Sequence, residues 1–227
     1  METTPAIEVR GLDHWFGSGE ARKQALFGID LAVEAGTLTA LVGASGSGKT
    51  TLLTLIGCLR TVEAGNIRLL GTELAGAPDP VRTACRRRLG FIFQAHNLHE
   101  SLTAMQNVRM GLEVHGAAAM ARWEEASAHL LTLLGLADRL DYLPGKLSGG
   151  QKQRVAVARA LIGNPDVVLA DDPTAALDRE TGLAVVDLLK RLGRTRGTTT
   201  LIVTHDPRIL DRADRIVTMQ DGRLVDG

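Results

Sequence analysis

The chain has 227 residues, which is enough for one large domain or for a domain with an inserted lobe. Lysine plus arginine and aspartate plus glutamate are equal at 26 each, so no overall field draws the chain to nucleic acid or to an anionic membrane, and we expect no nucleic-acid partner. The chain has two cysteines and no CxxC pair, which indicates a reducing compartment and neither a disulfide framework nor a zinc site. The sequence shows no secretion signal and no apolar run of the roughly 20 residues that a membrane span needs.

The first third of the chain is rich in strand patterns. Residues 6–10 alternate between apolar and polar side chains, and residues 38–42 form a short apolar run that stops at a glycine, as a buried strand does. Further strands are predicted at residues 25–33, 66–70 and 90–94, and a helix at residues 50–59.

From residue 95 to residue 164 the pattern changes to alanine-rich and leucine-rich helix, as in residues 123–134. Strand character then returns, alternating again with helix. The later elements are predicted as strands at residues 167–170 and 199–204, a helix at residues 179–194, and a hairpin at residues 215–226 around Asp221-Gly222.

Strands that alternate with helices imply a mostly parallel sheet. The helical stretch in the middle is best explained as an insertion into that arrangement. We therefore predict a single α/β domain over residues 1–227. Its core consists of residues 1–94 and 165–227, and residues 95–164 form an inserted α-helical subdomain.

A glycine-rich loop separates the apolar run at residues 38–42 from the helix that follows. Its residues fit the P-loop pattern GxxxxGK[ST] in full: Gly43, Ala44, Ser45, Gly46, Ser47, Gly48, Lys49 and Thr50. The glycines let backbone N–H groups curl around phosphates, Lys49 reaches the β and γ oxygens, and the Thr50 hydroxyl is placed to hold Mg²⁺. With Thr51 included in the nucleotide site, the loop predicts a P-loop NTPase (RecA-like) core.

The apolar strand at residues 167–170 ends in a carboxylate, Asp171, which is the Walker B arrangement. We expect Asp171 to bind Mg²⁺ through water, opposite Thr50. An isolated aspartate after a strand is usually a turn former or a helix cap. The P-loop upstream favours the metal role here.

A second anion-binding helix start follows about 100 residues after the P-loop, at Leu147 and the four residues Ser148, Gly149, Gly150 and Gln151. Two consecutive glycines leave the backbone bare, so that N–H groups come close to a phosphate. Ser148 caps the helix and offers a hydroxyl, and the helix directs its positive end at the same point. One chain therefore presents two anion sites.

The P-loop, Gln94, residues 147–151, Asp171 and His205 resemble, in order and spacing, the ATP-binding cassette (ABC) ATPases over essentially the whole chain. The resemblance implies ATP hydrolysis with ATP and Mg²⁺, and an N-terminal antiparallel β subdomain. It also implies that two cassettes face each other head to tail, as a homodimer formed on ATP binding. Each ATP is then held between one subunit's P-loop and the other subunit's LSGGQ segment, so the two anion sites of one chain serve different ATPs.

The resemblance also assigns roles to further residues. It implies that Gln94 contacts Mg²⁺ and the attacking water and joins the core to the helical lobe, and that His205 contacts the γ-phosphate. Phe16 lies where the family places an aromatic ring that stacks on adenine, although Trp15 is a rival and either could merely belong to the core. The implied catalytic residues are Asp172, His205, Gln94 and Lys49.

Asp172 departs from the family pattern, in which a glutamate follows the Walker B aspartate and acts as the general base. The aspartate carboxylate is one methylene shorter, so it is displaced by on the order of 1 Å, and a misplacement of that size can cost roughly 10²-fold in rate. We therefore predict slow hydrolysis with intact ATP binding. The alternative is that the loop shifts and Asp172 serves normally.

Shorter segments indicate which branch of the ABC ATPases the chain resembles. Resemblance to the MacB/LolD branch is carried by residues 43–53, 91–94, 102–108 and 173–178, and resemblance to DevA-type ATPases of DevBCA glycolipid exporters by residues 14–17, 22–24 and 93–99. This implies a subunit that powers a separate integral membrane permease, with a periplasmic membrane-fusion protein, in lipid, glycolipid or lipoprotein export. Such a subunit works on the cytoplasmic face of the bacterial inner membrane.

Two other classes compete with this interpretation. An FtsE-like mechanical signalling ATPase also acts on a membrane partner, and it stays the alternative. A soluble ABC protein of DNA repair or translation is disfavoured, because repair members insert long heptad coiled coils and translation members carry two cassettes in one chain. Neither feature occurs in this sequence.

A basic cluster precedes the strand predicted at residues 90–94, and consists of Arg82, Arg86, Arg87 and Arg88. It is predicted to be a solvated helix face that could lie near lipid head groups or an acidic loop of a partner. The apolar positions of residues 105–112 and 123–134 are predicted as core of the helical lobe. Some of them could form a groove for a coupling helix of a membrane subunit.

Overall fold

The computed structural model describes residues 4–225, apart from the side chain of Arg208. The strands are β1 (Ile7–Phe16), β2 (Lys23–Val33), β3 (Leu38–Val42), β4 (Ala64–Leu69), β5 (Thr72–Glu73), β6 (Leu89–Ile92), β7 (Val167–Asp171), β8 (Thr199–Val203), β9 (Arg215–Gln220) and β10 (Arg223–Val225). The α-helices are α1 (Lys49–Ile56), α2 (Asp79–Arg86), α3 (Ala104–Arg109), α4 (Ala117–Met120), α5 (Trp123–Leu133), α6 (Gly149–Leu161), α7 (Arg179–Arg196) and α8 (Pro207–Leu210).

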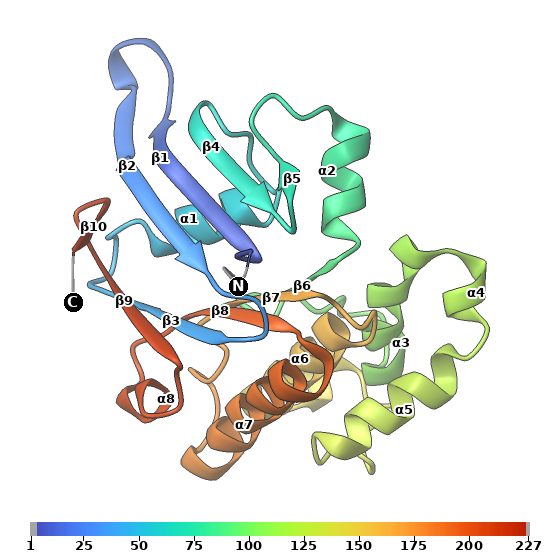
Figure 1. The fold of residues 1–227 in the computed structure, drawn as a ribbon. Helices are drawn as coiled ribbons and strands as arrows, with labels where there is room; N and C mark the ends of the chain where they lie inside the picture. The colour runs from blue at the N-terminus through green and yellow to red at the C-terminus, as the bar shows by residue number, and fades with distance from the viewer. Residues whose placement is uncertain (1–3, 226–227) are drawn as a thin grey trace.

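The strands form two sheets (Figure 1). The first is antiparallel, in the order β2-β1-β4-β5. The second has the order β10-β9-β3-β8-β7-β6, in which β9, β3, β8, β7 and β6 run parallel and β10 pairs antiparallel with β9. The predicted mostly parallel sheet and N-terminal antiparallel subdomain are confirmed. The predicted hairpin is β9 and β10, and its residue 226 lies outside the described residues.

Helix α1 lies between the two sheets (Figure 1), and its apolar side chains are fully buried there. Successive residues of a strand point to opposite faces. On β7, Val167 and Leu169 accordingly face the α1 side, whereas Val168 and Ala170 face the side covered by α6 and α7. A strand covered on both faces needs apolar residues throughout, which explains the uninterrupted apolar run before Asp171.

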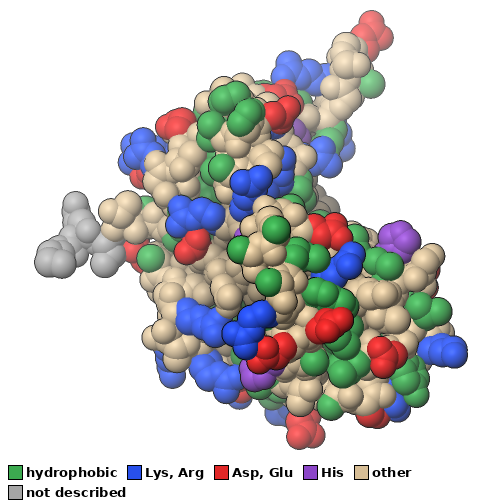
Figure 2. Space-filling view, turned by 90° about the vertical axis from the view of Figure 1, so that its right-hand side faces the viewer, with side chains coloured by type: hydrophobic (Ala, Val, Ile, Leu, Met, Phe, Trp, Pro, Cys, Tyr) green, Lys and Arg blue, Asp and Glu red, His purple; other side chains and the backbone are tan. Residues whose placement is uncertain are grey.

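A helical insertion joins β6 to β7, as predicted, and contains α3, α4, α5, α6 and a 3₁₀ segment at Met110–His115. The subdomain boundaries at residues 95 and 164 stay predictions. The face at the right of Figure 1 mixes basic and acidic side chains with small hydrophobic areas, and neither sign of charge dominates it (Figure 2). Among residues 4–225, no helix is both long and apolar enough to cross a membrane.

Two predicted boundaries are wrong in ways that affect the site. The helix predicted at residues 50–59 stops at Ile56, because Cys58 takes a left-handed conformation (φ 57°). The strand predicted at residues 90–94 stops at Ile92, because the chain turns there and the N–H of His96 donates to the Phe93 carbonyl at 3.2 Å. Gln94 therefore lies beyond the sheet, in a loop.

Candidate functional site

The glycine-rich loop between β3 and α1 packs so closely on its neighbours that two of its positions require glycine. Gly43 has φ 148°, and a Cβ atom there would lie 2.0 Å from the Met219 carbonyl oxygen. Gly48 has φ 104°, and a Cβ atom there would lie 2.8 Å from the Leu26 side chain. The loop is thereby fixed between β9 and β2, with its backbone bare on the inner side.

The ammonium group of Lys49 lies inside this loop. Its Nζ donates to the carbonyls of Gly43 (2.9 Å) and Ala44 (2.7 Å) and to the Ser47 hydroxyl (3.3 Å). Burial lowers the pKa of Lys49, while the nearby carboxylates of Asp172 and Asp171 act in the opposite direction. A cation is thus held where the oxygens of a bound phosphate could replace the loop carbonyls.

Thr50 and Asp171 face each other across the start of α1, as the sequence predicts. The Thr50 hydroxyl donates to Asp171 Oδ2 at 2.8 Å. Burial raises the pKa of Asp171, and the bond from Thr50 opposes that shift. No group of three or more His, Cys, Asp or Glu side chains within residues 4–225 is arranged to hold a metal. A hydroxyl and a carboxylate alone suit Mg²⁺, which binds through few protein oxygens together with substrate phosphates and water.

Asp172 and His205 meet at the ends of the neighbouring strands β7 and β8. The N–H of His205 donates to Asp172 Oδ1 at 3.3 Å, and its ring Nε2 lies 4.0 Å from Asp172 Oδ2. Asp172 is in the left-handed region (φ 45°). Because Ile92 pairs with Ala170 in parallel register, the exposed Gln94 leaves β6 at this same end of the sheet. The structure therefore places three of the predicted catalytic residues, Asp172, His205 and Gln94, at one edge of the sheet.

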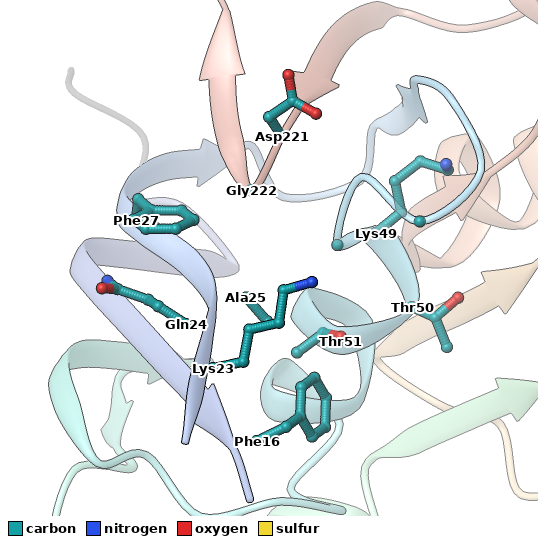
Figure 3. Close-up of a pocket in the computed structure, with 12 residues that line it drawn as sticks. Phe16, Lys23, Gln24, Ala25, Phe27, Lys49, Thr50, Thr51, Asp221 and Gly222 are labelled. Atoms are coloured by element: carbon teal, nitrogen blue, oxygen red, sulfur yellow. The ribbon is translucent and has the colours of Figure 1, made fainter. Parts of the chain in front are cut away.

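A cavity of about 580 Å³ opens beside the loop (Figure 3). Phe16, Lys23 and Thr51 lie on one side of it, and Asp221 on another (Figure 3). Trp15 does not line this cavity. Its ring instead lies under the guanidinium of Arg22, whose Cζ is 4.5 Å from the centroid of the Trp15 ring. Of the two aromatic candidates, the geometry favours Phe16.

The cavity is also lined by residues that the sequence did not predict for this site: Lys23, Gln24, Ala25, Phe27, Asp221 and Gly222. Lys23 pairs directly with Phe16 across the β1–β2 hairpin. The register of that hairpin is the signal that could have identified it.

The second anion site lies elsewhere. Ser148 caps α6, with its hydroxyl accepting from the Gln151 N–H (3.2 Å) and the Gln151 side chain accepting from the Ser148 N–H (2.9 Å). Gly150 is close to the chain after β7, and a Cβ atom there would lie 3.0 Å from the Ala176 carbonyl oxygen. None of residues 148–151 lines the cavity beside the P-loop. The helix start predicted as the second anion site is thus not part of the cavity beside the P-loop.

A protein-family model described as ABC transporter matches residues 26–175 of the chain. The lipoprotein-releasing system ATP-binding protein LolD 1 of Caulobacter vibrioides is 44% identical over 222 residues, covering 97% of this chain and 95% of that protein. The macrolide export ATP-binding/permease protein MacB 1 of Aeromonas hydrophila is 45% identical over 97% of this chain but only 34% of that protein. The chain thus spans about a third of the length of its MacB relatives.

Two solved structures are similar over 97% of both chains. One is a dimeric ATP-binding cassette in a post-hydrolysis state bound to ADP and Pi, with a TM-score of 0.91 and 35% sequence identity. The other is a dimeric bacterial ABC transporter cassette, with a TM-score of 0.92 and 36% identity. The fold and the order of its elements are therefore those of dimeric cassettes.

Proposed function

Because the chain belongs to the ABC transporter family, as an ATPase cassette of the LolD/MacB type, we propose that it powers a separate membrane permease in the export of lipid, glycolipid or lipoprotein. The near-complete coverage of a lipoprotein-releasing ATP-binding protein supports this. The proposed partners are a second copy of the chain, the integral permease and a periplasmic membrane-fusion protein. The chain would then sit on the cytoplasmic face of the inner membrane, held by the permease.

The separation of the two anion sites is the observation that carries the mechanism. The Gln151 N–H donates to the Ser148 hydroxyl oxygen, but the N–H groups of Gly149 and Gly150 have no partner within the helix, and the Ser148 hydroxyl keeps its hydrogen for donation. An anion is therefore expected at this helix start, yet the chain's own P-loop cavity lies elsewhere. Two chains placed head to tail would each complete the other's site, and the similar solved cassettes are dimers.

The proposed chemistry is attack of a water oxygen on the γ-phosphorus, with ADP as the leaving group. Asp172 takes the proton of that water, Gln94 positions the water, and His205 contacts the γ-phosphate. Lys49 binds the β and γ oxygens once it exchanges the loop carbonyls for them. Mg²⁺, held by Thr50, Asp171 and Gln94, would neutralise charge on the phosphates.

Adenine is proposed to stack on Phe16. The ring is 39% exposed at the cavity beside the P-loop, and the guanidinium of Arg60 lies 4.8 Å from its centroid. A cation on an aromatic face holds the ring in place. The exposed part of the ring is proposed as the surface on which the base stacks.

The permease is proposed to dock in a groove of about 380 Å³ between the end of α1 and the helical insertion. Leu59 and Val114 border it and are about half exposed, at 48% and 50%. Arg86 and Arg87 lie at the same groove. A permease helix with an apolar face and acidic flanking residues would match both the exposed apolar side chains and the arginines.

A substitution at the second anion site tests the shared-site proposal. Ser148→Arg fills the helix start with a cation and a long side chain, so ATP binding to the isolated chain should persist while ATP-dependent dimers disappear in light scattering. Thr195→Arg adds the same charge at an exposed position near the end of α7 and should dimerise normally. A Ser148→Arg variant that still dimerises with ATP and hydrolyses it normally would falsify the proposal.

The identity of the membrane partner distinguishes an export function from the FtsE-like signalling function. The tagged chain is solubilised from membranes in mild detergent with ATP present, and the proteins that co-purify are identified by mass spectrometry. A permease together with a membrane-fusion protein supports export. A regulator of cell-wall hydrolases supports the FtsE-like signalling function instead.

A further inference from the structure

The loop that carries Gln94 is anchored on both sides of this residue. Before it, the Phe93 ring stacks on Phe91 with centroids 4.2 Å apart. After it, His96 and Asn97 both take left-handed conformations, with φ values of 59° and 50°. Gln94 lies between these anchors and is exposed.

Arg159 on helix α6 supplies the second anchor. Its Nη2 donates to the His96 carbonyl at 2.7 Å, and its Nη1 donates to the Asn97 carbonyl at 2.6 Å. Burial lowers the pKa of Arg159. A planar guanidinium with two donors on one side suits two adjacent carbonyl oxygens, and a single ammonium does not match this geometry.

Two successive non-glycine residues in the left-handed region are uncommon, although His and Asn enter it more readily than most residues. Such conformations persist only where the surroundings hold them. Here the left-handed turn presents both carbonyls to one side chain, so the guanidinium and the turn depend on each other. The loop therefore follows α6 rather than moving independently of it.

We propose that Arg159 is a positioning residue that ties Gln94 to helix α6. The first turn of α6 carries the second anion site, which serves the ATP on the partner's P-loop, while Gln94 serves the ATP on the chain's own P-loop. Arg159 thus makes the geometry of one ATP site depend on occupancy of the other. This inference rests on the proposed function, in which Gln94 positions the attacking water.

Helix α6 offers a matched control. Arg154 also donates to two successive carbonyls, those of Leu134 (2.9 Å) and Gly135 (3.3 Å), at the end of α5. Arg154→Met removes a comparable pair of bonds from the same helix without touching the loop of Gln94. Any general effect of losing a guanidinium from α6 is therefore common to both variants.

Hydrogen exchange of the full-length chain tests the anchor directly. Arg159→Met should speed amide exchange of residues 94–99 by about tenfold or more and leave residues 134–136 unchanged, whereas Arg154→Met should do the reverse. Arg159→Lys, which keeps the charge but has a single donor group, should fall between wild type and Arg159→Met. Equal exchange of residues 94–99 in wild type and Arg159→Met overturns the inference.

The rate of ATP hydrolysis tests whether Arg159 acts through Gln94. Arg159→Met should lower kcat for ATP about tenfold, since a shift of the catalytic group by a fraction of 1 Å is costly, and leave KM unchanged. In a Gln94→Ala background the same substitution should have no further effect on kcat. A loss of the same size in both backgrounds overturns this inference alone, with the proposed role of Gln94 intact. Wild-type turnover in Gln94→Ala itself overturns that proposed role and, with it, this inference.

Discussion

Replacing Asp172 by glutamate is expected to speed ATP hydrolysis. Asp172 follows β7 directly and meets His205 through a 3.3 Å bond to the backbone N–H, while the imidazole Nε2 stays 4.0 Å away. The carboxylate is therefore held close to the ends of β7 and β8. A longer side chain relocates the base toward the water without adding a new chemical group.

The size of the gain follows from the added methylene. It moves the carboxylate by about 1 Å, and a misplacement of that size costs roughly 10²-fold, so Asp172→Glu should raise kcat by roughly 10²-fold. This corresponds to about 2.7 kcal/mol of activation free energy. The substitution has an opposing cost, because aspartate tolerates the left-handed conformation (φ 45°) better than glutamate does. We expect the free energy of unfolding to fall by roughly 1 kcal/mol.

Phosphate release at saturating ATP and Mg²⁺ measures the effect, with ATP affinity measured separately by nucleotide titration. Asp172→Asn is the matched control, since it keeps the shape and removes the base, and its kcat should fall below that of the wild type. An Asp172→Glu variant that folds, binds ATP as the wild type does and shows no gain in kcat refutes the reasoning. The loop would then already bring Asp172 into working position.

Two further substitutions test the loop and the fold. Lys49→Ala removes the cation held by the P-loop carbonyls and should abolish saturable ATP binding in a fluorescent-nucleotide titration, with unchanged affinity as the contrary result. At Asp214, burial acts to raise the pKa, but bonds from the Leu38 N–H and Lys190, both at 2.9 Å, outweigh it and hold the pKa below its ordinary 3.8. The stability that this carboxylate contributes is present above pH 3.8 and is lost as the pH falls through the lowered pKa. Asp214→Asn should therefore lower the melting temperature at pH 7, and this difference should close below pH 3.8; a difference independent of pH contradicts the assignment.

The sequence predicts the P-loop and the parallel sheet because their constraints are local. A strand buried on both faces must be apolar throughout, and a backbone that approaches Met219 as closely as Gly43 does admits no side chain. The capping box of Ser148 and Gln151 is likewise encoded in four residues. In each case the physical requirement and the residues that meet it lie together in the chain.

Other parts of the site depend on distances that sequence spacing does not encode. Gln94 and His205 are 111 residues apart in the sequence, and only the family resemblance placed them in one site. Lys23 belongs to no motif and was missed, although counting the hairpin register from the turn pairs it with Phe16. Arg159 gave no signal, since its acceptors are backbone carbonyls of residues more than 60 positions earlier.

Helix α6 has one feature that the local sequence encodes and one that it does not. Its cap at Ser148 is local and its contact through Arg159 is not. Arg159 follows Gly149 by ten positions of regular helix, a rise of about 15 Å. A helix of that length moves as a unit, so a shift of its first turn toward a phosphate must appear at the loop that carries Gln94. Because that loop leaves β6 at the same end of the sheet as Asp172, the proposed base would be especially sensitive to such a shift. Hydrolysis at one ATP would then wait for closure around the other, and the closed dimer would persist long enough to act on a membrane partner.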